Sequence, residues 1–355
     1  MQPVLQPPPE DKPYLRRLGW TIAVAALLLV IWRATDLLLL AFGSVLGAVI
    51  FRTVAGLLRR AGLRNEPIAL AFSIVLVLAA FGAIAWLITV QFGDQVFSLL
   101  SDLPQVIQSL QAQLAGSPVG AALVSALEAA AGGSTFADVL GDLITGAGQI
   151  LLNFLIVLIG AIFLAVHPEP YLAGIVLLTP PKARAAMRRA LNEISLALRL
   201  WLQAQLIQMA SMGLLVAAGL WFVGLDSWAA LGLLAGISEF VPYVGPAIAM
   251  LPALAIAATQ GGNLLWETLL VYLVVRLVQT NLVTPNVTGQ VISIPPALTL
   301  FVILGVGAVF GIYGLFFSAA LLVVAFVGVR ELYLRDTLGE DIEGVPRKET
   351  EDQAP

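Results

Sequence analysis

The sequence contains no cysteine and a single histidine, His167. Without cysteine there is no disulfide, no thiol nucleophile and no thiolate metal site, and one histidine argues against a histidine-based metal site. The sequence also lacks a Gly-x4-Gly-Lys-Ser/Thr phosphate loop and a His-Glu-x-x-His zinc motif. These absences predict a protein that is not an enzyme, does not hydrolyse ATP and carries no cofactor.

Charged residues are scarce as well. Only 11% of the 355 residues are charged and 59% are hydrophobic, whereas a soluble domain has about 25% charged and about 45–50% apolar residues. The mean hydropathy is +0.96. This composition predicts a multi-pass membrane protein whose main partner is the lipid bilayer. The net charge of −4 provides no basic surface for nucleic acid.

Long apolar runs account for most of the sequence. Because about 20 helical residues cross the hydrocarbon core of a bilayer, we expect an all-α polytopic integral membrane protein with about eight hydrophobic segments. The segments are 18–31, 37–58, 67–92, 143–166, 200–222, 228–260, 264–283 and 297–329.

The few basic residues predict the orientation of these segments. Lys and Arg cluster before the first segment, around 52–64, from 182 to 199 and after 329, whereas 93–142 contains acidic residues but no basic ones. Under the positive-inside rule, both termini face the cytoplasm and 93–142 is extracytoplasmic. We also expect 181–199 to form a separate interfacial helix on the cytoplasmic side.

Two segments, 228–260 and 297–329, are too long for one crossing and contain helix breakers. The predicted orientation of their neighbours requires each to leave the membrane on the side where it entered. We therefore expect two helical hairpins, the second with a hinge at Gly311 and Gly314. The alternative is that each segment forms one tilted or kinked helix.

These assignments predict the domain organisation. It comprises a cytoplasmic Pro-rich tail (1–14), three transmembrane segments (15–92), an extracytoplasmic helical insert (93–142), a C-terminal transmembrane transport region with both hairpins (143–335) and a cytoplasmic polar tail (336–355).

Glu239 is a carboxylate in the middle of the otherwise apolar first hairpin, and the helix breakers Pro242, Gly245 and Pro246 follow it. Intramembrane charge and broken helices are costly, and they are tolerated mainly where backbone lines a cavity or pathway. The alternative is a structural carboxylate that ties the hairpin to its neighbour. Arg276 on segment 264–283 is the candidate partner of Glu239, unless its side chain extends to the membrane surface instead.

Uncharged polar residues gather where segment 264–283 ends and where segment 200–222 begins. Amides can replace water around a small polar solute, or they can satisfy carbonyls at a helix end; the sequence leaves both interpretations open. The candidate pathway residues are Gln279, Asn281, Pro285, Asn286, Gly289 and Gln205.

Three motifs together resemble one known family. They are Glu239-Phe-Val-Pro-Tyr-Val-Gly-Pro246, Gln279-Thr-Asn-Leu-Val-Thr-Pro-Asn-Val-Thr-Gly289 and Gly311-Ile-Tyr-Gly314. With the insert at 93–142, they resemble the AI-2E family of transporters, the autoinducer-2 exporter family. The chain departs from the usual pattern at Ala320, where the family commonly has a proline, and at Ala204, where it has a glycine.

The resemblance implies a homo-oligomer in the bacterial inner membrane that exports the quorum-sensing signal autoinducer-2 or another small polar metabolite. We expect a secondary exporter whose coupling ion, if any, is H⁺ or Na⁺ bound near Glu239. The alternatives are a sodium(lithium)/proton antiporter, as some relatives are assigned, and a membrane scaffold that does not transport.

Overall fold

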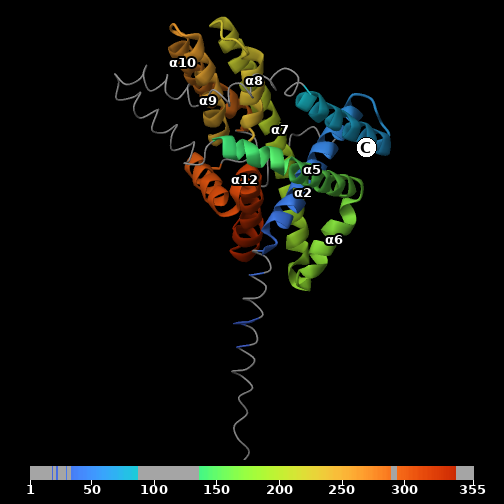
Figure 1. The fold of residues 1–355 in the computed structure, drawn as a ribbon. Helices are drawn as coiled ribbons and strands as arrows, with labels where there is room; N and C mark the ends of the chain where they lie inside the picture. The colour runs from blue at the N-terminus through green and yellow to red at the C-terminus, as the bar shows by residue number, and fades with distance from the viewer. Residues whose placement is uncertain are drawn as a thin grey trace, which may run out of the picture.

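The computed structural model describes residues 33–86, 136–288 and 294–340, together with the isolated positions 18, 21, 22 and 29. Nearly all of segment 18–31, the larger part of the 93–142 insert, both tails apart from 336–340, and Gly289 lie outside the described residues. Within the described ranges every regular element is a helix, which confirms the all-α prediction (Figure 1). Five of these helices are long and apolar enough to cross a membrane, or six if one bent pair forms a single span.

Inside each described range the helices follow one another with short connections. They are α2 (Thr35–Arg60), the helix Glu66–Trp86, α5 (Phe136–Val166), α6 (Pro168–Leu178), η1 (Pro181–Ala183), α7 (Arg184–Phe222), α8 (Trp228–Ser238), α9 (Val244–Gln260), α10 (Leu264–Val278), η2 (Gln279–Val283), α11 (Thr284–Thr288), α12 (Pro296–Val329) and η3 (Arg330–Thr337).

Helix α7 is the central element of the bundle. It packs against α2, α8, α10 and α12 (Figure 1). One buried cluster joins α7 to α2 and α12 through residues such as Leu202 and Val323, and a second joins α7 to α8, α9 and α10 through residues such as Met212 and Tyr272. Both hairpins are therefore positioned by the same helix.

The separate interfacial helix expected at 181–199 is not present. Helix α7 continues through this region without a break, from Arg184 to Phe222. Its 39 residues span about 58 Å at about 1.5 Å per residue, almost twice the hydrocarbon core of about 30 Å. The arginine-rich half of α7 is therefore expected to project out of the bilayer, because no breaker separates it from the apolar half.

A short apolar helix, α6, was missing from the expected segments. It follows α5 at an angle of 88°, and the break lies at His167 and Pro168, with the proline in the first turn of α6. Proline is tolerated in a first turn but ends a preceding helix. The expected segments therefore omit one apolar helix of the described chain.

The first hairpin consists of α8 and α9. With 11 and 17 residues, the two helices are about 16 Å and 25 Å long, and each is too short to cross the hydrocarbon core alone. The backbone turns at Tyr243, which has a φ of 67°. Gly245 then lies so close to the Ser238 carbonyl that a side chain there would overlap it, which accounts for glycine at this position.

The second hairpin lies within α12. At Gly311 the backbone adopts φ 63° and ψ −150°, a region that essentially only glycine visits. A Cβ at Gly307 would lie 3.4 Å from the Leu315 Cβ, although residues eight apart in a straight helix are about 12 Å apart. By length alone 296–337 qualifies as one span, but the chain folds back at Gly311 into two legs.

Candidate functional site

An ion pair lies at the tip of the first hairpin. The Glu239 side chain is 3% exposed, and Arg276 Nη1 of α10 lies 3.3 Å from its Oε1 and 3.5 Å from its Oε2. The Arg276 guanidinium also lies over the ring of Tyr243, 5.4 Å from its centroid. Of the two alternatives for Arg276, pairing with Glu239 is therefore the one that the structure adopts.

Gln205 binds the same tip from α7. Its side chain is 2% exposed, and its Nε2 donates to the backbone carbonyl of Glu239 at 2.6 Å. The last carbonyls of a helix have no partner within that helix, and Glu239 is the residue at which α8 ends. The amide of Gln205 therefore satisfies a carbonyl that the broken helix leaves free.

Gln279, the first residue of η2 directly after α10, forms a polar contact with α7. Its side chain is 1% exposed, its Nε2 donates to the Gln208 carbonyl at 3.1 Å, and its Oε1 accepts from the Ser211 hydroxyl at 3.1 Å. Arg276 and Gln279 are three residues apart and share a helix face, as do Gln205 and Gln208. The two faces create a polar seam between α7 and α10, which we define by Gln205, Gln208, Ser211, Arg276 and Gln279.

Asn281 and Asn286 do not join this polar seam. Both are exposed, and each side-chain amide donates to the carbonyl four residues earlier in its own helix, at 2.9 Å and 2.7 Å. Residues two apart on a helix do not face the same side, so Asn281 cannot accompany Gln279. Of the two interpretations left open by the sequence, Asn281 and Asn286 therefore follow the one in which the amide satisfies a backbone carbonyl.

The chain after Gln279 is also more regular than expected. Instead of irregular backbone, a π-helical stretch leads directly into α11. Pro285 is the second residue of α11 and is exposed. The helical path therefore continues through Pro285 and does not break there.

The breakers of the first hairpin hold the tip in place. Gly245 and Pro246 are buried and Pro242 is half-buried. Next to them, Phe240 stacks on Phe316 of the second hairpin with ring centroids 4.3 Å apart, and Trp201 of α7 meets Phe240 edge-on at 6.1 Å. Sequence reasoning missed this aromatic contact, because phenylalanines in apolar segments do not reveal which neighbours they touch.

The second hairpin is also held at its tip. Tyr313, between Gly311 and Gly314, accepts a hydrogen bond at its hydroxyl from Asn153 Nδ2 of α5 at 2.9 Å. Gly314 is buried and lies against the Val306 carbonyl of the opposite leg, whereas Gly311 is exposed. Gly311 is therefore the bend itself, and Gly314 allows the two legs to approach.

The described ranges hold no group of three or more His, Asp or Glu side chains that could bind a metal ion. A model of the AI-2E family transporters matches residues 21–333. The chain belongs to the AI-2E transporter family. The resemblance of its three motifs to this family is thereby confirmed, and transport is the role that the family supports.

Two proteins of Bacillus subtilis (strain 168) are similar to this family member. One, named "Putative transport protein YrrI", is 26% identical over 138 residues, which are 39% of each chain. The other, "Putative transport protein YueF", is 26% identical over 149 residues, which are 42% of this chain and 40% of the relative. The matched region thus spans about two fifths of each relative.

Proposed function

We propose that the protein is a secondary exporter of a small polar metabolite, with its site at the tip of the first hairpin. The carrying observation is the pair between the buried Glu239 and Arg276, whose side chain is 32% exposed, at a broken helix. Burying a charged carboxylate is costly even when it is paired, so stability alone is a weak reason to keep it there. A role in transport, in which the carboxylate gains and loses its charge, explains the position of Glu239 better.

The pair suggests how protonation of Glu239 would allow a solute to bind, and how loss of that proton would release the solute as the ion pair re-forms. When Glu239 is ionised, it holds Arg276 at 3.3 Å. A proton on Glu239 removes this attraction and frees the guanidinium donors for a solute. Proton binding and solute binding at the tip would then be coupled through the same two side chains, as a secondary transporter requires.

The polar seam supports a small hydroxylated solute as the substrate. The guanidinium of Arg276 is partly exposed and can donate to a solute, whereas the amide of Gln279 would have to exchange its bonds to α7 for bonds to the solute. Helices broken in the membrane also present backbone groups to a ligand. Autoinducer-2, a small hydroxylated molecule and the substrate for which the family is named, is the first candidate. We further propose the bacterial inner membrane, cytoplasmic termini and a homo-oligomer as the setting.

The antiporter alternative requires Glu239 to bind a sodium or lithium ion. Arg276 already provides a positive charge next to both carboxylate oxygens, so a metal cation would have to displace the guanidinium. This arrangement favours the exporter over the antiporter. A scaffold without transport would need no ionisable pair at the tip.

The test uses purified protein in vesicles, in which autoinducer-2 efflux and sodium-dependent internal pH are followed together. Glu239→Gln is expected to abolish the response of solute flux to a proton gradient. Glu267→Gln, which removes an exposed carboxylate of α10, is the matched control and should transport normally. Normal proton-dependent flux in Glu239→Gln would reject the assignment, and sodium-dependent pH change without solute flux would establish the antiporter.

A further inference from the structure

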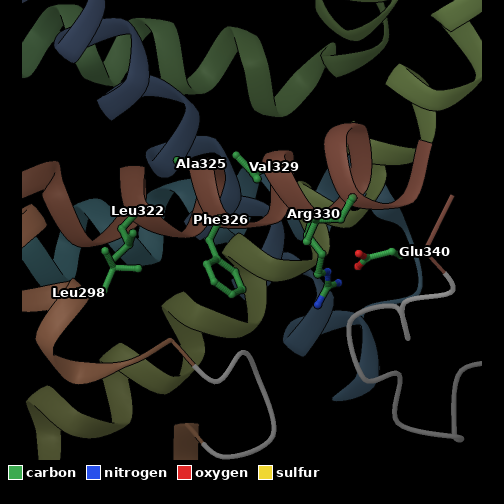
Figure 2. Close-up of a pocket in the computed structure, with 8 residues that line it drawn as sticks. Leu298, Leu322, Ala325, Phe326, Val329, Arg330 and Glu340 are labelled. Carbon is green, nitrogen blue, oxygen red and sulfur yellow. The ribbon is translucent and has the colours of Figure 1, made fainter. Parts of the chain in front are cut away.

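A pocket of about 500 Å³ lies at the end of the second hairpin away from its bend (Figure 2). Leu298 from the first leg lies opposite Leu322 from the second, and most of the remaining lining is apolar as well. The pocket ends at two charged side chains, Arg330 and Glu340. Its lining residues are Leu298, Leu322, Ala325, Phe326, Val329, Arg330, Leu334 and Glu340.

Arg330 is only loosely paired by the residues that the structure describes. Its side chain is 16% exposed, and its Nε and Nη2 are buried without a hydrogen-bond partner. The Oε1 of Glu331 lies 3.6 Å from Nη2, and the other oxygen of Glu331 already accepts from Arg335 at 3.2 Å. The guanidinium is thus held by one long ion pair, and the part of it that lines the pocket keeps its positive charge available to an anionic ligand.

The position of Arg330 in the chain indicates where that ligand comes from. No charged residue occurs between Pro296 and Val329, and Arg330 is the first charge after this apolar run. Leu298 and Val329 are 41% and 56% exposed, so one side of the pocket faces outward from apolar helices. Water is a poor occupant, since an ordered water needs two to four polar partners.

We propose that this pocket binds an anionic phospholipid of the surrounding bilayer. One acyl chain lies between the legs of the second hairpin, against Leu298, Leu322 and Phe326. The lipid phosphate pairs with the part of the Arg330 guanidinium that lines the pocket, because guanidinium groups bind phosphate strongly. This places the lipid between the two legs that meet at Gly311.

Glu340 determines how tightly the lipid binds. Its carboxylate faces the Arg330 guanidinium across the pocket (Figure 2). A lipid phosphate at Arg330 would lie close to this second negative charge. Neutralising Glu340 should therefore strengthen binding of an anionic lipid and leave a zwitterionic lipid unaffected.

The experiment is native mass spectrometry of the full chain in a neutral detergent, titrated with phosphatidylglycerol or with phosphatidylcholine of the same acyl chains. The wild type is expected to retain one phosphatidylglycerol in preference to phosphatidylcholine. Arg330→Gln should reduce this preference about fivefold, the effect of losing one basic contact of about 1 kcal/mol. Glu340→Gln should raise it.

Arg189→Gln is the matched control, because it removes one exposed arginine that pairs with Asp336 near the same end of the molecule. Equal preferences in Arg189→Gln and Arg330→Gln would overturn the proposal, as would equal retention of both lipids by the wild type. If Arg330→Gln does not fold, Ala325→Trp fills the pocket and keeps the guanidinium. Unchanged phosphatidylglycerol retention in Ala325→Trp would likewise overturn it. The readout involves no flux, so its outcome is independent of the proposed export.

Discussion

Single side chains at the tip of the first hairpin stabilise the tip and also form the proposed transport site. Glu239 is buried, its carboxylate is bound by Arg276 and its backbone carbonyl by Gln205. Each partner comes from a different helix, so the tip is held from two directions. Replacing Arg276 or Gln205 leaves a buried group of Glu239 without its partner, and the resulting loss of stability can be measured.

Arg276→Gln is expected to lower the stability of the folded protein by about 3 kcal/mol, because it leaves a buried carboxylate without its cation. The double variant Glu239→Gln/Arg276→Gln should recover part of this loss, since no uncompensated charge remains. Thermal unfolding in detergent, followed by the loss of monodisperse protein, measures both. A double variant that is less stable than Arg276→Gln would contradict a direct interaction.

Gln279→Ala and Asn281→Ala test the polar seam with two neighbouring amides. Gln279→Ala removes two interhelical hydrogen bonds from a buried side chain, and it should cost about 1–3 kcal/mol of stability and lower solute flux. Asn281→Ala removes one exposed bond within a helix and should change both quantities little. Thermal unfolding and vesicle efflux are the measurements, and equal effects would reject the distinction between them.

At this scale the sequence singled out Glu239 and offered Arg276 as its partner in one of two alternatives, but it did not distinguish the amides that face the hairpin from those that do not. An intramembrane carboxylate stands out by charge alone, and Arg276 is the basic residue within the neighbouring helix. Whether Gln279 or Asn281 faces the hairpin depends on how α10 is rotated. That rotation is determined by packing against α7, which composition does not encode.

At the scale of elements, two broken helices meet through aromatic rings. Phe240 of the first hairpin stacks on Phe316 of the second, and Trp201 of α7 contacts the same ring. Close packing of α7 on α8 supports this arrangement, because a Cβ at Gly236 would lie 2.8 Å from the Met209 carbonyl. The tips are thus packed against each other rather than separated by α7.

Phe240→Ala is expected to uncouple the hairpins. Losing the stacked ring should lower the maximal rate of solute efflux while leaving the solute concentration for half-maximal rate nearly unchanged, since Phe240 donates no hydrogen bond to a solute. Phe72→Ala, which removes an exposed ring from another helix, serves as the control. A change confined to the half-maximal concentration would instead place Phe240 in the binding site.

Gly311→Ala is expected to destabilise the second hairpin by about 1–3 kcal/mol, because its backbone conformation is one that side chains avoid. Gly305→Ala is the matched control. Both glycines have open space for a Cβ, but only Gly311 has a positive φ, so Gly305→Ala should be neutral or stabilising by up to about 1 kcal/mol. Thermal unfolding of the two variants provides the comparison, and equal stabilities would contradict a bend at Gly311.

The breakers in the sequence predicted where both hairpins turn, since proline and glycine act on the local backbone. The length of α7 was not predictable in the same way. Its charged and apolar halves differ in composition, but no breaker separates them, and α-helical hydrogen bonding continues across a change in polarity. The bend before α6 was overlooked because Pro168 follows an apolar run that already appeared complete.

At the scale of the whole molecule, the chain segments that connect the helices gather near the two opposite ends of α7. The arginine-rich start of α7 and the end of η3 share one end, where Arg189 pairs with Asp336 at 3.2 Å. The loops that lead into α8 and α10 lie at the other end (Figure 1). Which of these ends faces the cytoplasm stays a prediction from the basic residues.

The absence of cysteine from the sequence allows a direct test of this orientation. Single variants Arg188→Cys and Leu338→Cys should react with a membrane-impermeant maleimide from the same side of the membrane, and Asn263→Cys from the other. All three positions are exposed. Labelling of intact cells and of inverted vesicles distinguishes the sides, and reaction of all three from one side would reject the topology.

The hairpin geometry also has a consequence for biosynthesis. Helix α8 has 11 residues and is too short to be recognised as a span when it leaves the ribosome. The carboxylate of Glu239 at its end pairs with an arginine that is synthesised 37 residues later. Insertion of the first hairpin therefore has to follow the synthesis of α10. A nascent chain that ends before Arg276 should leave α8 and α9 outside the bilayer, where quality-control proteases can reach them.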